Sequence, residues 1–163
     1  MCVDFAWKEW EQAGSKWALR NIKLRIPRKL IFVAGLLTVF SCFRNPDLAP
    51  QGTDHQAYLR LIHTHLARYV SLTPLEIVSH ELSKLSLKED AGQLLDVYDE
   101  FLQRLDDLKV RASLDELPPR RVYDDEIFLA VRDLSHGFQD ILAEVFFEKK
   151  TALRDFNKSY GVF

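Results

Sequence analysis

The sequence predicts an all-α protein of about four helices after an apolar anchor segment, ending in a long antiparallel helical hairpin. Three observations predict this class. The 163-residue chain has only six Gly and six Pro, its apolar residues recur at spacings of three and four as on one helix face, and capping-box patterns mark helix starts. A chain of this length has room for one domain, or for one domain with an anchor.

Residues 1–29 are a basic and aromatic leader or stem. Seven basic residues against three acidic ones give this segment a net charge of +4, and because the whole chain carries −2, the remaining 134 residues carry −6. The leader contains all three Trp, and Trp10 and Trp17 share one helical face. Trp and basic residues favour a membrane interface. The alternative is a frayed stem, or a segment that the mature protein does not keep.

The segment 30–43, LIFVAGLLTVFSCF, has no charge. A spanning helix needs roughly 20 apolar residues, so three interpretations stay open: a signal-peptide core, an uncleaved anchor whose flanking basic side chains snorkel, and a buried core helix. Basic residues precede the segment, so the positive-inside rule predicts an extracytoplasmic helical domain. A buried core helix would instead predict a cytoplasmic protein.

The end of this segment, Val39-Phe40-Ser41-Cys42, resembles a bacterial lipobox. The resemblance implies cleavage before Cys42 and lipidation of that thiol, although Phe40 departs from the usual small or aliphatic residue. A leader of 29 residues is also long for the charged region of a signal peptide. A plain buried thiol is the alternative for Cys42. The only other cysteine is Cys2, so there is no disulfide framework.

Residues 44–53 predict a tether, because Pro, Gly, Asn and Asp dominate them. The helical domain, 54–163, then begins with a helix over about 54–70. Thr73-Pro74-Leu75-Glu76 is a capping box that begins the second helix. Ser86-Leu87-Lys88-Glu89 repeats this pattern and predicts a third helix, to about residue 112.

Pro118-Pro119 interrupts the helical pattern between residues 113 and 122. Asp124 or Asp125 is then placed to cap the last helix. The apolar residues on one face of the third predicted helix recur with the same period as those of the last helix, so we expect the two helices to pair as an antiparallel hairpin. Aromatic residues on these two faces and just beyond them are the candidates for a protein-interaction surface: Tyr98, Phe101, Phe138, Phe146 and Phe147.

No catalytic motif is present: the chain lacks a P-loop, a Gly-rich dinucleotide turn and a nucleophile elbow. His63 and His65 point about 200° apart on a helix and do not share an ion. Acidic clusters read as solvated faces or helix caps. The sequence therefore predicts no catalytic residue, metal or cofactor, and its acidic body argues against nucleic acid as a partner.

The order of features in residues 57–112 resembles the helical region after the transmembrane segment of D-type Bat proteins of bacterial aerotolerance operons. Ala57-Tyr58-Leu59-Arg60, Leu72-Thr73-Pro74-Leu75-Glu76-Ile77 and the segment 102–110 carry the resemblance. It implies a role in assembly within a membrane complex and supplies no catalytic residue. The family places this region in the cytoplasm, whereas the charges here predict export.

The sequence thus predicts a non-catalytic, membrane-tethered bacterial helical module that binds an unidentified protein partner. Its membrane attachment would be segment 30–43 or a lipid on Cys42. One alternative is a soluble cytoplasmic regulatory or binding protein with 30–43 as a core helix. A small helical enzyme with no recognisable motif is the other.

Overall fold

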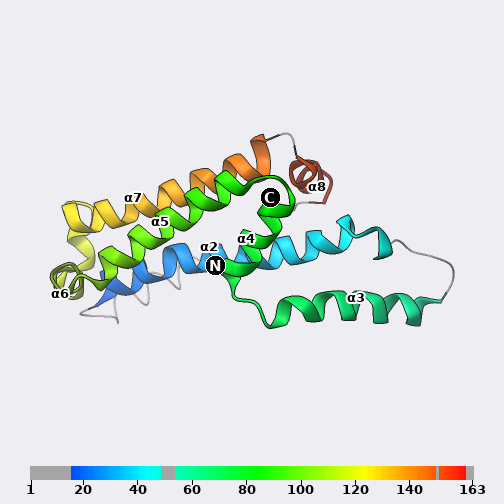
Figure 1. Cartoon of the computed structure of the whole chain (residues 1–163). Coiled ribbons are helices and arrows are strands. Elements are labelled where there is room, and N and C mark those ends of the chain that lie inside the picture. Colours follow the sequence, from blue (N-terminus) through cyan, green and yellow to red (C-terminus); the bar gives the residue numbers. More distant parts are fainter. Residues whose placement is uncertain (1–15, 49–53, 150, 161–163) are drawn as a thin grey trace. The chain divides into compact units, whose positions relative to one another are not determined.

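A computed structural model describes residues 16–48, 54–149 and 151–160 (Figure 1). Within these ranges every regular element is helical, which confirms the all-α class. The α-helices are α2 (Trp17–Arg44), α3 (His55–Val70), α4 (Pro74–Lys84), α5 (Lys88–Asp106), α6 (Leu108–Glu116), α7 (Glu126–Ala143) and α8 (Ala152–Tyr160). Short 3₁₀ turns η1 (Pro46–Leu48) and η2 (Pro119–Arg121) and a π-helical turn η3 (Glu144–Glu148) complete the order.

The chain divides into two compact units. Unit 1 comprises Met1–Arg28 and Asp96–Asp140, and unit 2 comprises Lys29–Leu95 and Ile141–Phe163. Helices α2, α5 and α7 each contribute residues to both units.

Unit 1 has a core of aliphatic residues from α2 and aromatic residues from α5 and α7. Its fully or almost fully buried side chains include Ile22, Ile26, Phe101, Leu114, Val122, Phe128, Val131 and Phe138. The Arg25 guanidinium lies 5.9 Å from the centre of the Phe128 ring, a cation–π contact between α2 and α7. At the start of α2, the Lys16 amide donates to the Asp115 carbonyl of α6 at 2.8 Å.

Unit 2 is built around the carboxyl-terminal part of α2. That part buries Leu30, Val33, Ala34, Leu37 and Phe40, and the rest of the unit buries Ile77, Val78, Leu82, Leu87, Leu94, Leu142, Val145, Phe146 and Leu153. One side of the apolar segment 30–43 is therefore part of the core of unit 2.

The predicted start of α4 is confirmed. The Thr73 hydroxyl accepts from the Glu76 amide at 3.3 Å, and the Glu76 carboxylate accepts from the Thr73 amide at 2.7 Å. Pro74 occupies the first helical position, where its missing N–H costs nothing. The predicted cap of the last helix is also present, because the Asp125 carboxylate accepts from the Phe128 amide at 2.7 Å.

Ser86 does not cap α5, which begins at Lys88, one residue later than a cap at Ser86 predicts. Ser86 has φ 63° and instead ends α4. The Leu87 amide donates to the Leu82 carbonyl at 2.9 Å and the Ser86 amide donates to the Ser83 carbonyl at 3.1 Å. This is a Schellman ending, in which a left-handed residue closes the last turn of a helix.

The helix predicted to run to about residue 112 is interrupted at Asp107. This residue is extended, with φ −64° and ψ 116°, and its carboxylate accepts from the amides of Lys109 and Val110 to begin α6. Asp prefers such a cap to a helix interior because its short carboxylate competes for backbone amides. The described residues after the apolar segment therefore hold six α-helices instead of about four, and the hairpin pairing stays a prediction.

After α7 the chain widens into the π-helical turn η3. The Asn157 amide of α8 donates to the Phe146 carbonyl of this turn at 3.0 Å. Lys149, which follows the turn, lies 2.5 Å from the buried carboxylate of Asp90 on α5. These contacts hold α8 and the end of η3 in unit 2.

One predicted segment boundary falls inside a helix of the structure. Helix α2 runs without interruption across the predicted border between leader and apolar segment at residues 29 and 30, and includes Pro27. Residues 46–48 of the predicted tether form η1, whose Leu48 is buried, and residues 49–53 fall outside the described residues. The expectations for Trp7, Trp10 and Cys2 fall outside the described residues.

Candidate functional site

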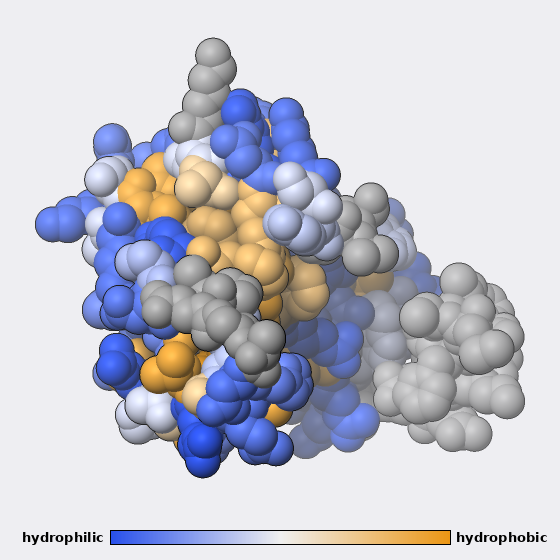
Figure 2. Space-filling model, turned by 90° about the vertical axis from the view of Figure 1, so that its right-hand side faces the viewer, coloured by the Kyte–Doolittle hydropathy of each residue, from blue (hydrophilic) through white to orange (hydrophobic). Residues whose placement is uncertain are grey.

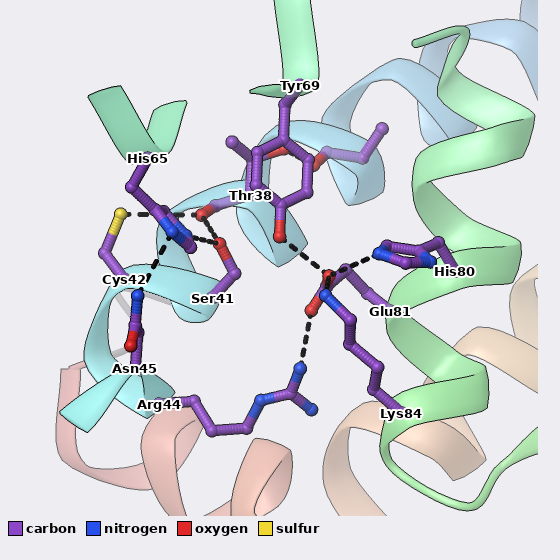
Figure 3. Close-up of polar contacts among 11 residues, drawn as sticks. Thr38, Ser41, Cys42, Arg44, Asn45, His65, Tyr69, His80, Glu81 and Lys84 are labelled. Atoms are coloured by element: carbon purple, nitrogen blue, oxygen red, sulfur yellow. Dashed lines mark hydrogen bonds and ion pairs between the residues drawn. The ribbon is translucent and has the colours of Figure 1, made fainter. Parts of the chain in front are cut away.

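The polar centre of unit 2 is the carboxylate of Glu81 on α4, which is fully buried. Its Oε1 accepts from the Tyr69 hydroxyl at 2.7 Å and from the Lys84 ammonium at 2.9 Å (Figure 3). Its Oε2 accepts from the Arg44 guanidinium at 2.9 Å. A buried charge is tolerated only when it is paired and hydrogen-bonded, and both oxygens of Glu81 meet this condition.

This Glu81 cluster (Arg44, Tyr69, Glu81 and Lys84) links three helices. Arg44 stands in the last turn of α2, Tyr69 in the last turn of α3, and Glu81 with Lys84 one turn apart on α4. The exposed fractions of the Arg44 and Lys84 side chains are 27% and 44%, so both cations also reach water. The arrangement fixes how α2, α3 and α4 meet.

A second polar group joins the middle of α3 to α2. His65 Nε2 lies 2.8 Å from Ser41 Oγ, and His65 Nδ1 lies 3.3 Å from Asn45 Nδ2 (Figure 3). The Ser41 hydroxyl donates to the Thr38 carbonyl at 2.7 Å, so it accepts from His65 Nε2–H. His65 Nδ1 then accepts from the Asn45 amide. The network assigns a neutral His65 with its proton on Nε2.

A hydroxyl, an imidazole and an amide in this order also occur in hydrolases, where the imidazole activates the hydroxyl. Here the Ser41 proton is committed to a backbone carbonyl, and Ser41 is only 3% exposed. A substrate has no access to such a hydroxyl. A pocket of about 430 Å³ lies in unit 1, lined by Lys23, Leu102, Gln103, Leu105, Asp106 and Arg111. The Ser41–His65–Asn45 contacts thus connect helices and do not form a nucleophile.

Burial and neighbouring charges shift the pKa values of this region. Burial raises the pKa of the Tyr69 phenol above its ordinary value, and the adjacent Glu81 carboxylate adds to the rise. Burial lowers the pKa of His65, and the positive charges of Arg68 and Lys84 lower it further, while Glu81 acts in the opposite direction. Both groups therefore keep their neutral forms near neutral pH.

One side of α2 in unit 2 is apolar and open to solvent. We call Ile31, Phe32, Val39 and Phe43 the α2 apolar face; their exposed fractions are 62%, 57%, 50% and 62%. At 100° per residue these side chains lie within about 120° of one another around the helix. Large apolar side chains gathered in this way mark interaction surfaces more often than scattered ones do.

Aromatic rings extend this face onto α8. The Phe43 ring lies 5.0 Å from Phe156 and 5.5 Å from Tyr160, and Phe40 lies 5.0 Å from Phe156. Tyr160 is 65% exposed. Figure 2 shows a contiguous hydrophobic area, bordered by hydrophilic residues, on the side of the molecule that carries α8 and the end of α2 in Figure 1.

The residues predicted as an interaction surface are mostly internal. Phe101, Phe138 and Phe146 are at most 4% exposed, so they contact no partner while their units stay folded. Tyr98 is half-buried and stacks on Phe101 at 6.4 Å, and Phe147 is 44% exposed. The structure brings none of these five into the Glu81 cluster.

The lipidation candidate Cys42 lies in the last turn of α2 and is half-buried. Its thiol points to the Thr38 carbonyl, with Sγ and oxygen 3.8 Å apart. Cleavage before Cys42 would separate Ser41 from Arg44 and remove the packed face of α2 from unit 2. Lipidation of Cys42 stays a prediction.

Sequence reasoning missed Glu81, and it gave His65 no partner. A signal for Glu81 was present, because this acidic residue follows Ile77 by four positions on the apolar side of α4. His63 is exposed and His65 is half-buried, in agreement with their opposite directions on the helix. Within the described ranges, no group of three His, Cys, Asp or Glu side chains could hold a metal ion.

Comparison with known proteins finds no matching family model, no matching curated protein and no matching solved structure.

Proposed function

We propose that this protein is a non-catalytic helical module that attaches to a membrane surface through the α2 apolar face and serves in the assembly of a protein complex. The observation that carries the proposal is the position of Ile31, Phe32, Val39 and Phe43. All four are half or more exposed on one side of the helix that is otherwise the core of unit 2.

The length and composition of α2 support a membrane environment. Among the described residues it is the one helix long and apolar enough to cross a bilayer, with a mean hydropathy of 1.6 over 18 residues. Yet 39% of that window is buried within the protein. A helix with one packed side and one apolar side lies along an interface, with its exposed residues in the boundary between headgroups and acyl chains.

Charge at the amino-terminal side favours an anionic lipid surface. Residues 1–29 carry a net charge of +4, and within α2 the side chains of Lys23 and Arg28 are exposed. Each basic residue near an anionic leaflet contributes about 1 kcal/mol to attachment. Aromatic rings such as those of Phe43 and Tyr160 prefer the same interfacial depth.

The soluble alternative has support of its own. Leu30, Val33, Ala34, Leu37 and Phe40 are at most 5% exposed, as a core helix requires. Both functions require this packing. In the membrane-attached module lipid covers the α2 apolar face, whereas in the soluble binding protein a protein partner covers it.

Flotation with vesicles separates these functions. Full-length protein at about pH 7.5 is mixed with phosphatidylcholine vesicles that contain none or roughly 30% phosphatidylglycerol. We expect flotation with the anionic vesicles. The double variant Phe32→Ser/Val39→Ser loses at least about tenfold in partitioning, because one buried Phe alone contributes about 1.5–3 kcal/mol. The matched control Leu61→Ser removes an equally exposed apolar residue from α3 and floats like the wild type.

Absence of flotation, or equal flotation of the double variant, would contradict the membrane role and favour the soluble binding protein. The intact mass of the chain from its native membranes tests the lipid on Cys42. A species that begins at Cys42 with added acyl mass would exclude the α2 attachment, because residues 31–39 would be gone. A full-length unmodified mass is the result that the proposal expects.

A further inference from the structure

Helix α3 is attached to the rest of unit 2 by few contacts. Of its sixteen residues only Tyr69 is buried, and Leu59, Leu61 and Val70 are 46%, 51% and 86% exposed. The apolar residues of this helix are thus incompletely covered. Within the described residues, two side chains of α3 form polar contacts with the other helices: Tyr69 contacts Glu81 at the end of α3, and His65 contacts α2 at its middle (Figure 3).

The His65 contact requires a neutral imidazole. Nδ1 faces the amide nitrogen of Asn45, which donates to it. The orientation of that amide is set by its own oxygen, which accepts from the Asp47 backbone N–H at 3.1 Å. A proton on Nδ1 would place two donors against each other. Flipping the Asn45 amide to relieve this would give up the bond from Asp47.

The charges around His65 also oppose a second positive charge. Arg68 follows it on α3, Lys84 faces it from α4, and the Arg44 guanidinium at the end of α2 is held by Glu81. Glu81 is the acidic group near by, but both of its oxygens already accept from Arg44, Lys84 and Tyr69. His80 on α4 also lies 4.0 Å from Glu81. The Cys42 thiol and the Tyr69 phenol are the other titratable groups on this side.

We infer that His65 is a pH-sensitive latch: its protonation releases the middle of α3 from α2 within unit 2 and uncovers the partly buried apolar residues Ile62 and Leu66. The released helix is amphipathic and offers an apolar surface that is covered at neutral pH. This inference goes beyond the proposed function and does not rest on membrane contact.

The direction of the pH dependence follows from linkage. Because the pKa of His65 is lowered in the folded protein, the docked state binds fewer protons than the open state. The contribution of the latch is present above the ordinary histidine pKa of about 6.5. It is lost as the pH falls below that value, and the loss levels off below the lowered folded pKa.

Hydrogen exchange of the full chain tests the latch. Protection of the α3 amides is measured at about pH 7.5 and pH 5.5, with correction for the intrinsic exchange rate, over the range where histidine titrates. We expect protection in α3 to fall at the acidic pH, because the docked state binds fewer protons than the open state. In His65→Gln, which cannot be protonated, the fall is absent. The matched control His63→Gln, on the exposed side of the same helix, behaves like the wild type.

The variant Asn45→Asp should favour a protonated His65 instead of a neutral one. Its carboxylate keeps an acceptor for the Asp47 amide and accepts from a protonated Nδ1 of His65, so we expect α3 to stay protected at about pH 5.5. A proton NMR titration of the wild type gives a readout that does not depend on how a variant folds: the His65 ring should titrate below the ordinary histidine pKa of about 6.5. A His65 pKa at or above that ordinary value, or α3 protection that is equal at both pH values, overturns the inference.

Discussion

The cluster around Glu81 predicts a strong stability effect for a small change in chemistry. Glu81→Gln keeps the size of the side chain and an oxygen for the Tyr69 hydroxyl, but it removes the charge that pairs with Arg44 and Lys84. Removing one partner of a buried ion pair costs about 3–5 kcal/mol when the other charge stays buried. Here the two cations are 27% and 44% exposed and can turn to water, which reduces the loss.

We therefore expect Glu81→Gln to lower the free energy of unfolding by about 2–3 kcal/mol, the worth of one or two lost hydrogen bonds to a charged group. For a chain of this size the midpoint of thermal unfolding should fall by roughly 5–10 °C. The matched control is Glu100→Gln, which breaks the exposed pair with Arg104, where both side chains are about half exposed. That change should cost less than about 0.5 kcal/mol.

Urea unfolding followed by far-ultraviolet circular dichroism measures both variants. Because the chain has two units, it need not unfold in a single step. The two variants are therefore compared on the unfolding transition that responds to Glu81→Gln. Equal losses in the two variants would refute the reasoning, since a solvated pair and a buried one would then be worth the same. A loss in Glu81→Gln that vanishes in an Arg44→Met background would confirm that the two side chains act together.

The remaining predictions concern helix ends. Thr73→Ala removes the cap of α4 and should cost about 1 kcal/mol in urea unfolding. Hydrogen bonds from the Thr73 amide and hydroxyl lower the pKa of Glu76. The Glu76 carboxylate therefore stabilises the folded protein above its unfolded pKa, and this stabilisation is lost as the pH falls through the lowered folded pKa. An NMR titration that gives Glu76 an ordinary pKa would contradict this. Asn157→Leu leaves the Phe146 carbonyl of η3 without its donor, which should cost about 1–3 kcal/mol and increase exchange in α8, whereas unchanged exchange would show that the bond is dispensable.

Sequence reasoning succeeded where the signal is local. The capping box at Thr73 and the cap at Asp125 lie within four residues of the groups they satisfy, so their patterns decide the helix starts without the rest of the fold. It failed at Ser86 and Asp107 because their patterns fit more than one structure. Ser86 opens a capping-box pattern but closes the preceding helix. Asp107 belongs to a cluster that fits a solvated face or a helix cap, and it caps a new helix inside the segment predicted as one helix.

The candidate site depends on contacts that no local pattern contains. Glu81 meets Arg44 and Tyr69, which are 37 and 12 residues away in the chain. His63 and His65 look alike in the sequence, and the packing of α3 against α2 alone decides which of them meets Ser41. The apolar segment 30–43 has a packed side and an exposed side, and this division follows from the helices that surround it.

The central claim is that α2 keeps one side in the core of unit 2 while its apolar face contacts lipid. A polarity-sensitive fluorophore on a single cysteine tests this directly, in a Cys2→Ser/Cys42→Ser background whose circular dichroism matches the wild type. We expect a label at Val39 to shift to the blue when anionic vesicles are added, and a label at Leu61 on α3, equally exposed in solution, to stay unchanged at neutral pH. No shift at position 39, or an equal shift at both positions, would contradict the account.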